Sequence, residues 1–487
     1  MSTFNNHDRP HADLRELVER VRDIGELVEI QGADWNLEIG ALTEIVCSSG
    51  KRPIPALLFD DIPGYPKGFR ILSGLSNSPR RLALTMGLPE PDGLMDLVRA
   101  YRDRMKHHRL IPPRPCTAGT VLENVDRDGD VDVFKFPVPW LHQRDGGRYI
   151  GTDDLVIMRD PEEGWVNVGC YRVVAHAGDK VGVFIVPGKQ GDQIRRKYFE
   201  RGQACPVLIC CGHDPLLFHA AGHEIRFGTS EYDYAGGHRG MPFDVIESEL
   251  HGLPMPAHAE IVLEGVMLPD ESELEGPFGE FTGYYVGERL SQPVVRVQRV
   301  YHRNDPILTI ATPMRPPSDY SFSRCVIRAG MIWDQIERAG LAGVEGVWCH
   351  EAGAGRLFNV IALRQKYPGH AKQAAMLAAT CQSAIYFGRF VVVVDDDIDP
   401  SNLDEVVWAM SMHCDPAEHI ELLRGMWTGP VDIFFSKKPG TNSRAIIDAC
   451  RPWHMLNDFP PMSKIDKELR ARVSRKFADV LKGICGT

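Results

Sequence analysis

Two glutamates in the middle of the chain are the first candidates for acid–base chemistry. They stand at the ends of the hexapeptide Glu275-Gly-Pro-Phe-Gly-Glu280. Because Pro and Gly break helices, this stretch is expected to form a tight loop that can turn both carboxylates inward. Close carboxylates in a partly dry site repel each other, which raises the pKa of one above its usual value of about 4.3. On this loop alone, a solvated surface turn remains the alternative.

An arginine upstream could hold one of these carboxylates. It ends the strand-like run Trp165-Val-Asn-Val-Gly-Cys-Tyr-Arg172. In a regular strand Asn167 and Arg172 point to opposite faces, and a bulge near Gly169 would bring them to one side. The guanidinium fork of Arg172 can bind both oxygens of a carboxylate at once.

A second group of acids supports a different hypothesis. The apolar run Val391–Val394 is followed by Asp395-Asp-Asp-Ile-Asp399, and acids at the end of a buried strand can hold Mg²⁺ in a phosphohydrolase. The segment Asp399–Glu405 also has the features of a helix start, where acids are favourable without a metal. A metal-dependent phosphohydrolase that uses Asp395–Asp399 is therefore the alternative function.

The composition is that of an ordinary globular protein. The chain has 487 residues, which indicates two to four domains, with 43% hydrophobic and 25% charged residues. The net charge of −11 gives no electrostatic sign of nucleic-acid binding. No apolar run is long enough to span a bilayer, the first residues lack a signal-peptide core, and the 12 cysteines form no C-x-x-C pair. These features predict a reduced, cytoplasmic protein without nucleic-acid or membrane partners, whose cysteines lie in or next to strands.

Three regions follow from the periodicity. In the first, a helical pattern from Leu14 to Ile24 precedes the strand Leu27–Ile30, Asn36 is expected to cap a second helix, and residues 95–107 form another helix. The Pro-rich Ile111–Pro115 ends this α/β domain, placed at 1–112.

The second region, 113–305, consists of short β-like runs with Gly and Pro turns, which favours a barrel or sandwich. One charged helix is expected within it, at 192–201. The third region, 306–487, alternates helices and strands and is expected to be a layered α/β domain. Its helices are predicted at about 326–339, 370–386, 402–411 and 465–482.

Read together, these pieces resemble the UbiD-like family of prenylated-flavin decarboxylases. The resemblance covers most of the chain from about residue 140 onward, in a fixed order of motifs. The motifs are Gly147-Arg-Tyr-Ile-Gly-Thr152, Asn167-Val-Gly-Cys-Tyr-Arg172, Glu231-Tyr-Asp-Tyr-Ala-Gly236, Pro256-Ala-His-Ala-Glu-Ile-Val-Leu-Glu-Gly265, Glu275-Gly-Pro-Phe-Gly-Glu280 with Tyr284-Tyr285, Gly369-His-Ala-Lys372, Asp396-Asp-Ile-Asp399 and Ile447-Asp-Ala449.

The resemblance implies a multidomain α+β fold and a carboxy-lyase. It implies a central flavin-reductase-like split β-barrel that binds prenylated FMN, between N-terminal and C-terminal α/β domains, in a homodimer or higher homo-oligomer. A flavin prenyltransferase would supply the cofactor. The implied reaction is reversible, non-oxidative loss of CO₂ from an aromatic, heteroaromatic or α,β-unsaturated acid, with the flavin as the electron sink that side chains cannot provide.

The resemblance also assigns residues. Arg172, Glu275 and Glu280 form the catalytic network, with Glu280 as the proton donor. Mn²⁺, with K⁺ nearby, would anchor the cofactor phosphate through Asn167 and Glu231. The implied cofactor-binding residues are Thr152, Asn167, Gly169, Cys170, Tyr171, Arg172, Lys189, Gln190, Ala221, Gly222, His223 and Glu231, and the implied pocket residues are Phe281, Met314, Arg315, Trp427 and Thr428.

The sequence departs from the family at the third metal ligand. Where the family has a histidine after a Pro-Gly turn, this chain has Pro187-Gly-Lys189-Gln190. Because Gln190 is a weaker neutral ligand and Lys189 could neutralise the phosphate directly, weaker dependence on the metal is expected. His223 is a candidate to replace the missing ligand.

Overall fold

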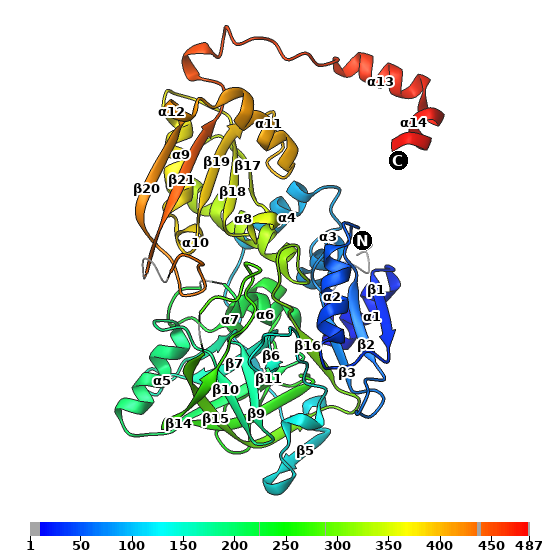
Figure 1. Ribbon diagram of the computed structural model, residues 1–487, viewed down its shortest axis with the longest axis vertical. Coiled ribbons are helices and arrows are strands. Elements are labelled where there is room, and N and C mark those ends of the chain that lie inside the picture. The colour runs from blue at the N-terminus through cyan, green and yellow to red at the C-terminus, as the bar shows by residue number, and fades with distance from the viewer. Residues whose placement is uncertain (1–9, 224, 288, 436–439, 486–487) are drawn as a thin grey trace.

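The computed structural model describes residues 10–223, 225–287, 289–435 and 440–485. In Figure 1 the largest sheet lies at the bottom, a smaller N-terminal sheet lies beside it, and a C-terminal sheet lies at the top. The last helices extend away from the body as an arm. The chain is therefore a multidomain α+β protein.

The N-terminal sheet has the order β1-β2-β3-β16. Its elements are β1 (Leu27–Gln31), β2 (Ala56–Asp60), β3 (Arg70–Ser73) and β16 (Ile307–Ile310), with helices α1 (Leu14–Asp23), α2 (Glu38–Ser48), α3 (Pro79–Met86) and α4 (Leu94–Lys106). The predicted first helix and strand are confirmed. Strand β16 pairs in parallel with β3, so the chain beyond residue 305 first completes the N-terminal sheet and only then enters the C-terminal region.

The predicted cap of α2 is wrong by one residue. The N-cap is Leu37, which has φ of 71° and makes no side-chain capping bond. The Leu37 N–H donates instead to the Trp140 carbonyl at 2.9 Å, and Asn36 forms an isolated bridge with Trp140. A contact with a distant loop, not a local side chain, sets the start of this helix.

The central sheet is antiparallel and follows the order β6-β9-β10-β15-β14-β11-β7-β8, with β5 paired to β15. Its strands are β5 (Asn124–Arg127), β6 (Arg148–Gly151), β7 (Asp154–Arg159), β8 (Val166–Gly169), β9 (Val173–Ala177), β10 (Lys180–Val183), β11 (Cys205–Cys211), β14 (Ile261–Glu275) and β15 (Leu290–His302). The predicted β-rich texture of this region is confirmed.

The connection between β8 and β9 shows that this sheet is curled. The two strands lie near opposite ends of the sheet order, so strands about 4.8 Å apart would place them roughly 29 Å from each other in a flat sheet. Only Cys170, Tyr171 and Arg172 join them, and four Cα steps reach about 15 Å at most. The sheet must therefore curl into a half-barrel, and this connection, which replaces the predicted bulge near Gly169, crosses between its two ends.

Smaller elements pack around the half-barrel. They are a three-stranded sheet of β4 (Arg114–Pro115), β12 (Asp244–Glu247) and β13 (Pro254–Pro256), and helices α5 (Gln190–Glu200), α6 (Pro215–Ala221) and α7 (Glu231–Arg239). Short 3-10 turns lie at Thr120–Leu122, Asp128–Asp130, Val133–Lys135, Glu351–Gly353 and Trp453–Met455.

The C-terminal sheet has the order β17-β18-β19-β21-β20. Its strands are β17 (Val344–Cys349), β18 (Phe358–Leu363), β19 (Phe390–Asp395), β20 (Ile420–Trp427) and β21 (Thr441–Ala449), with helices α8 (Ser321–Arg338), α9 (His370–Thr380), α10 (Gln382–Ile385), α11 (Leu403–His413), α12 (Pro416–His419), α13 (Lys467–Lys476) and α14 (Ala478–Cys485). The predicted α/β alternation is confirmed, although the helices predicted at 370–386 and 465–482 are each divided in two. Strand β19 is continuously apolar because it pairs in parallel on both sides in the middle of the sheet.

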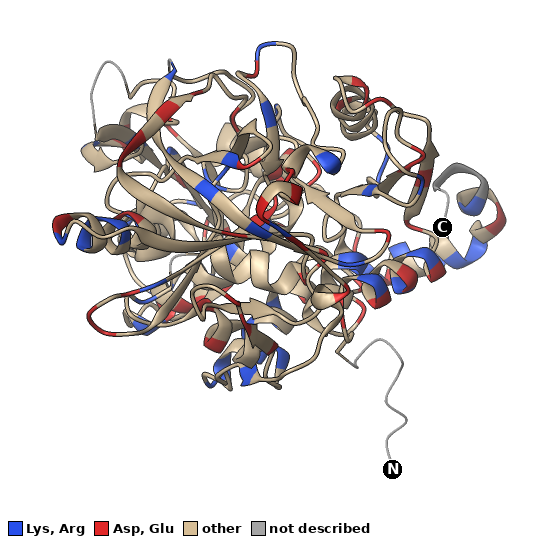
Figure 2. Cartoon of the chain, turned by 90° about the horizontal axis from the view of Figure 1, so that it is seen from below, with Lys and Arg blue, Asp and Glu red and all other residues tan. Residues whose placement is uncertain are grey.

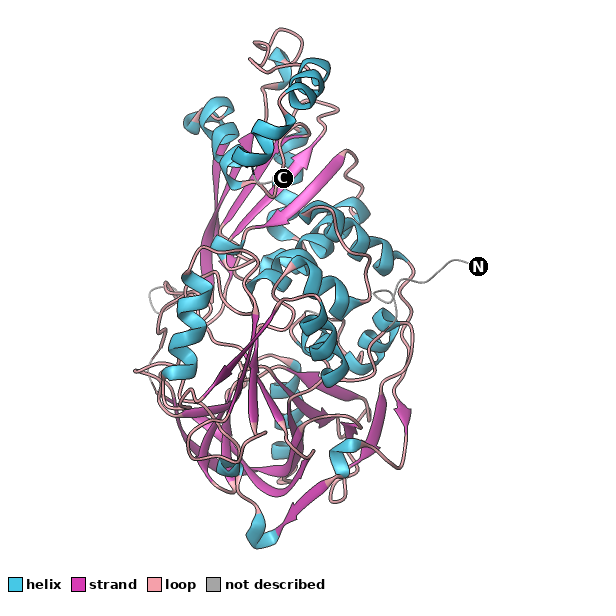
Figure 3. Cartoon of the chain, turned by 90° about the vertical axis from the view of Figure 1, so that its right-hand side faces the viewer, coloured by secondary structure: helices cyan, strands magenta, loops and turns pink. Residues whose placement is uncertain are grey.

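Helices connect the two larger sheets. Figure 3 shows them between the half-barrel and the C-terminal sheet. One hydrophobic core there contains Leu97 of α4, Ile332 of α8, Trp348 of β17 and Leu208 of β11. This shared core holds the C-terminal sheet close to the half-barrel.

The charged side chains are distributed over the whole chain. In Figure 2 both signs alternate along the helical arm, in agreement with the sequence of α13. Among the described residues, no helix is both long and apolar enough to cross a membrane.

Candidate functional site

The structure brings the two glutamates of the hexapeptide onto one arginine. Arg172, in the connection between β8 and β9, binds Glu275 through Nε to Oε1 at 2.7 Å and Nη2 to Oε2 at 2.9 Å. Its Nη1 donates to Glu280 Oε1 at 2.5 Å. Glu275 is therefore held by a two-point ion pair and Glu280 by a single hydrogen bond.

The surroundings of this triad are nearly dry. Glu275 is 2% exposed and Glu280 9% exposed. Burial raises the pKa of Glu280 to about 7, although Arg172 opposes the rise. The Arg172 guanidinium also stacks 4.0 Å from the ring centre of Phe184. A carboxyl group that exchanges a proton near neutral pH thus lies beside a permanently charged arginine.

Strand β6 adds Tyr149, which lies in the motif at 147–152 but had no role assigned to it from the sequence. The Tyr149 hydroxyl donates to Glu275 Oε1 at 2.8 Å, and its ring packs 4.2 Å from Phe278. Tyr149 is fully buried. Glu275 therefore accepts three hydrogen bonds, while Glu280 accepts one within the triad, which distinguishes the roles of the two carboxylates.

The loop before β6 fixes the hexapeptide. The Gly146 N–H donates to the Pro277 carbonyl at 2.7 Å, and the Gly279 N–H donates to Asp145 Oδ1 at 3.1 Å. A side chain at Gly146 would collide with the Gly276 carbonyl, so only glycine allows this approach. The predicted tight loop is present and is buried, not a solvated surface turn.

A second cluster lies at the other end of the segment that carries Arg172. Asn167 Nδ2 donates to Gln190 Oε1 at 2.8 Å and to the Glu231 carboxylate at 3.1 and 3.2 Å. The Val168 N–H donates to Glu231 Oε2 at 2.6 Å. Residues from β8, α5 and the first turn of α7 therefore meet, and the side chain of Gln190 is among them.

This cluster offers oxygen ligands to a cation. Asn167 Oδ1 is buried and has no hydrogen-bond partner among the described residues. Burial raises the pKa of Glu231 to about 8, and a bound cation would favour the ionised carboxylate. Amide and carboxylate oxygens suit Mg²⁺, Mn²⁺ or Ca²⁺. The described residues contain no group of three His, Cys, Asp or Glu arranged for a metal, so Gln190 and Asn167 would have to contribute.

The remaining cofactor candidates surround the segment 169–172. The Tyr171 hydroxyl accepts a hydrogen bond from the Gly191 N–H at 3.1 Å, and a side chain at Gly169 would collide with the Tyr171 ring. Thr152 Oγ1 accepts from the Ala311 N–H at 3.0 Å. Tyr171 therefore connects the segment that carries Arg172 to the start of α5, next to Gln190.

The candidates on α6 lie at its C-terminal end. Ala221 is its last residue and Gly222 its C-cap. His223 Nδ1 contacts the His219 carbonyl. The imidazole of His223 is thus engaged at the end of α6, whereas the amide of Gln190 is the group that meets Asn167.

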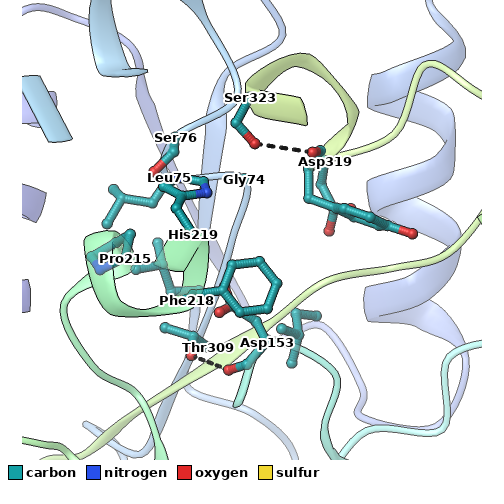
Figure 4. A pocket seen from close by; sticks show the side chains of 13 residues that line it. Gly74, Leu75, Ser76, Asp153, Pro215, Phe218, His219, Thr309, Asp319 and Ser323 are labelled. Atoms are coloured by element: carbon teal, nitrogen blue, oxygen red, sulfur yellow. Dashed lines mark hydrogen bonds between the residues drawn. The ribbon is translucent and has the colours of Figure 1, made fainter. Parts of the chain in front are cut away.

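A pocket next to α6 contains two acids, the partly buried Asp153 and the buried Asp319. Figure 4 shows Phe218 and His219 of α6 facing Asp153 and Asp319. Burial raises the pKa of Asp153 to about 7 and that of Asp319 to about 6. The Thr309 hydroxyl donates to the Asp153 carbonyl at 2.9 Å. The two carboxyl groups, together with His219 Nε2, which has no hydrogen-bond partner among the described residues, make this pocket suitable for water or a polar ligand group.

Two aromatic residues of the C-terminal region approach both halves of the site. The Phe387 ring lies 5.5 Å from Phe281, the residue after Glu280. The Lys189 ammonium lies 5.2 Å from the Tyr386 ring, and Tyr386 packs 4.6 Å from Trp427. Of the implied pocket residues, Phe281 is thus next to the triad, and Trp427 packs against Tyr386.

Other implied pocket residues have structural contacts. Met314 packs with Cys47 and Ile54 in a small apolar cluster. The buried Thr428 hydroxyl donates to Asp432 at 2.8 Å. The backbone of Arg315 lies against Gly283, in the loop that follows Glu280.

The acidic strand end that suggested a phosphohydrolase is paired with arginines. Asp395 accepts from the Arg451 N–H at 2.8 Å and from its Nε at 3.0 Å. Asp396 pairs with Arg364 at 2.7 Å and Asp397 with Arg451 at 2.8 Å. These ion pairs favour the structural explanation of the acidic run, so it does not support a metal-dependent phosphohydrolase.

Comparison with known families gives three matches that together cover most of the chain. The models are those of the 3-octaprenyl-4-hydroxybenzoate carboxy-lyase N-terminal domain at residues 18–101, its Rift-related domain at 115–316 and its C-terminal domain at 321–449.

Individual relatives are similar over nearly their full length. Pyrrole-2-carboxylic acid decarboxylase of Pseudomonas aeruginosa is 34% identical, over 97% of this chain and 99% of its own. Phenolic acid decarboxylase of Bacillus subtilis is 30% identical, over 91% and 93%. The UbiD-class enzyme HmfF of Pelotomaculum thermopropionicum, solved in complex with FMN, has a TM-score of 0.82 at 27% identity, over 94% and 98%. An evolved dimeric form of that enzyme is solved in complex with prFMN.

Proposed function

The chain belongs to the UbiD family of carboxy-lyases, and we propose that it decarboxylates an aromatic, heteroaromatic or α,β-unsaturated acid, reversibly, with prenylated FMN as cofactor. The arrangement of Arg172 between Glu275 and Glu280 carries the proposal. It supplies one fixed charge pair and one exchangeable proton in a dry site. Loss of CO₂ from an sp² carbon needs both an electron sink and a proton to replace the carboxylate.

Glu280 is the proton donor in this proposal. Its pKa of about 7 allows it to hold a proton at neutral pH and to lose it to carbon. Glu275 stays ion-paired with Arg172 and hydrogen-bonded to Tyr149, and in this way it holds the Arg172 guanidinium in place. In the reverse direction the Glu280 carboxylate removes a proton from the product.

Asn167, Gln190 and Glu231 would hold the cation that anchors the cofactor phosphate. The unpartnered Asn167 Oδ1 and the buried Glu231 carboxyl support this assignment, since both gain a partner when a cation binds. The oxygen-only set suits Mn²⁺, and K⁺ is a second candidate cation. When bound, prenylated FMN supplies the electron sink for decarboxylation.

Lys189 precedes Gln190 and can add positive charge for a phosphate. The segment from Gly169 to Arg172 connects the Asn167 cluster, where the phosphate would bind, to Glu275 and Glu280. The flavin ring system is proposed to lie along this segment. Thr152, Ala221, Gly222 and His223 are proposed as further contacts of the cofactor on the same side.

The proposed enzyme is a homodimer or higher homo-oligomer that receives its cofactor from a flavin prenyltransferase. Large apolar side chains are exposed in the C-terminal region, including Met412 of α11, Leu422 of β20 and Val480 of α14. Exposed apolar surface of this kind is typical of subunit interfaces.

The test of the function is reconstitution. The protein is co-expressed with a flavin prenyltransferase, its visible spectrum is recorded, and loss of pyrrole-2-carboxylate and 4-hydroxybenzoate is followed by chromatography. Flavin-like absorbance together with decarboxylation of a carboxylic acid by the loaded protein, and none by flavin-free protein, is expected. Full turnover without flavin would refute the proposal.

A further inference from the structure

Arg324 is a partly buried arginine in the first turn of α8, on the side of the site that faces Glu280. Its Cζ lies 4.4 Å from the ring centre of Tyr320 and 6.0 Å from that of Phe281, the residue after Glu280. Within the described parts of the chain, Arg324 makes cation–π contacts with these two rings, and no carboxylate forms an ion pair with it. The site therefore contains a guanidinium whose charge is not matched.

This position is unfavourable for a cation in the absence of a ligand. The N-terminal end of a helix carries partial positive charge, which repels a cation in the first turn. Partial burial of a guanidinium without an anion adds a desolvation cost. Stacking on Tyr320 offsets only part of these costs. An anionic ligand would complete the pairing.

The charges of Arg172, Glu275 and Glu280 indicate which anion would pair with Arg324. Arg172 already faces Glu275 and Glu280, so a substrate carboxylate entering beside them meets repulsion. The positive charge of Arg324 also acts on Glu280. Burial raises the pKa of Glu280, and the charges of both Arg172 and Arg324 oppose that rise. Arg324 is thus a second cation of the site, with its hydrogen-bond donors available.

We propose that Arg324 binds the carboxylate of the substrate and so orients the carbon that bears it toward Glu280. A guanidinium fork binds both oxygens of a carboxylate, which fixes direction as well as position. The inference rests on the proposed decarboxylase function. It has a specific consequence: the product has no carboxylate, so proton exchange on the product does not require Arg324.

The experiment compares two reactions of the same holoenzyme. Wild type, Arg324→Gln and Arg324→Lys are loaded with prenylated FMN, and flavin content is measured by absorbance. The KM and kcat for pyrrole-2-carboxylate and 4-hydroxybenzoate are determined, and deuterium uptake by pyrrole and phenol in D₂O is followed by NMR. Arg338→Gln, at the exposed C-terminal end of α8, is the matched control.

For Arg324→Gln we expect full flavin content, a KM for the acid raised roughly 10- to 100-fold, and product exchange within about twofold of wild type. Arg324→Lys is expected to recover part of the affinity. Unchanged KM in Arg324→Gln, equal loss of product exchange, or loss of the flavin would each overturn the inference. Absence of both reactions in the loaded wild type would instead refute the proposed function.

Discussion

Replacing Glu280 with glutamine tests the proton donor directly. Glutamine has nearly the same shape, and its Oε1 can still accept the hydrogen bond that Arg172 Nη1 gives to Glu280 at 2.5 Å. The variant therefore keeps the packing and loses only the exchangeable proton. General acid catalysis typically contributes about 10² to 10⁴ in rate, so we expect kcat to fall by that factor.

The pH dependence gives a second measure of the same group. Because burial raises the pKa of Glu280 to about 7, wild type should lose activity as pH rises through about 7, where the acid becomes ionised. One pH unit above the pKa, only about a tenth of the molecules keep the proton. Glu280→Gln should lack this alkaline decline.

The assay uses cofactor-loaded protein with the flavin spectrum recorded first. Decarboxylation is followed by chromatography, and the reverse proton transfer by deuterium uptake of the product in D₂O. Glu271→Gln is the control, since Glu271 lies on β14, the strand that leads into the hexapeptide, is partly exposed and pairs with Arg296. An unchanged spectrum with loss of both reactions in Glu280→Gln, and neither effect in Glu271→Gln, is the expected result.

Two results would refute this reasoning. Deuterium exchange near the wild-type rate in Glu280→Gln would move the proton to Glu275 or to bound water. Loss of the flavin itself would mean that Glu280 has a structural role in the loop.

Three further predictions concern stability and metal binding. Tyr149→Phe removes a buried hydrogen bond to Glu275 and should lower the free energy of unfolding by about 1 to 3 kcal/mol, measured by urea titration; no change would show that the bond contributes nothing. Arg81→Met removes the close ion-pair partner of the buried Glu26, leaving Arg80 at 4.0 Å, and should cost about 3 to 5 kcal/mol in the same titration. Arg99→Met, at an exposed pair, should cost under about 1 kcal/mol, and equal effects of the two substitutions would contradict the argument. Gln190→His should increase the Mn²⁺ that remains after dialysis against a chelator, by roughly tenfold or more in affinity, as measured by elemental analysis; unchanged retention would exclude position 190 as a ligand.

Several features of this protein were fixed by local sequence. The helical spacing of Leu14 to Ile24, the apolar run of β19 and the Gly-Pro loop at 275–280 each depend on neighbours in the chain, and each is present in the structure. The order of the family motifs likewise needs no coordinates, and it predicts both the enzyme class and the candidate site residues. What the departure at Gln190 implies for the metal stays a prediction.

Tertiary packing decided the rest. Arg172 and Glu275 are 103 positions apart, and Asn167 and Glu231 are 64 apart, yet each pair is in hydrogen-bond contact because the central sheet curls and helix α7 begins at its edge. No local preference encodes that curl, the return of β16 to the N-terminal sheet, or the start of α2 at Leu37, since each depends on a partner from a distant segment. The pairing of Tyr149 with Glu275 and the position of Arg324 beside Phe281 have the same origin: both follow from which surfaces pack together, and side-chain type alone does not specify that.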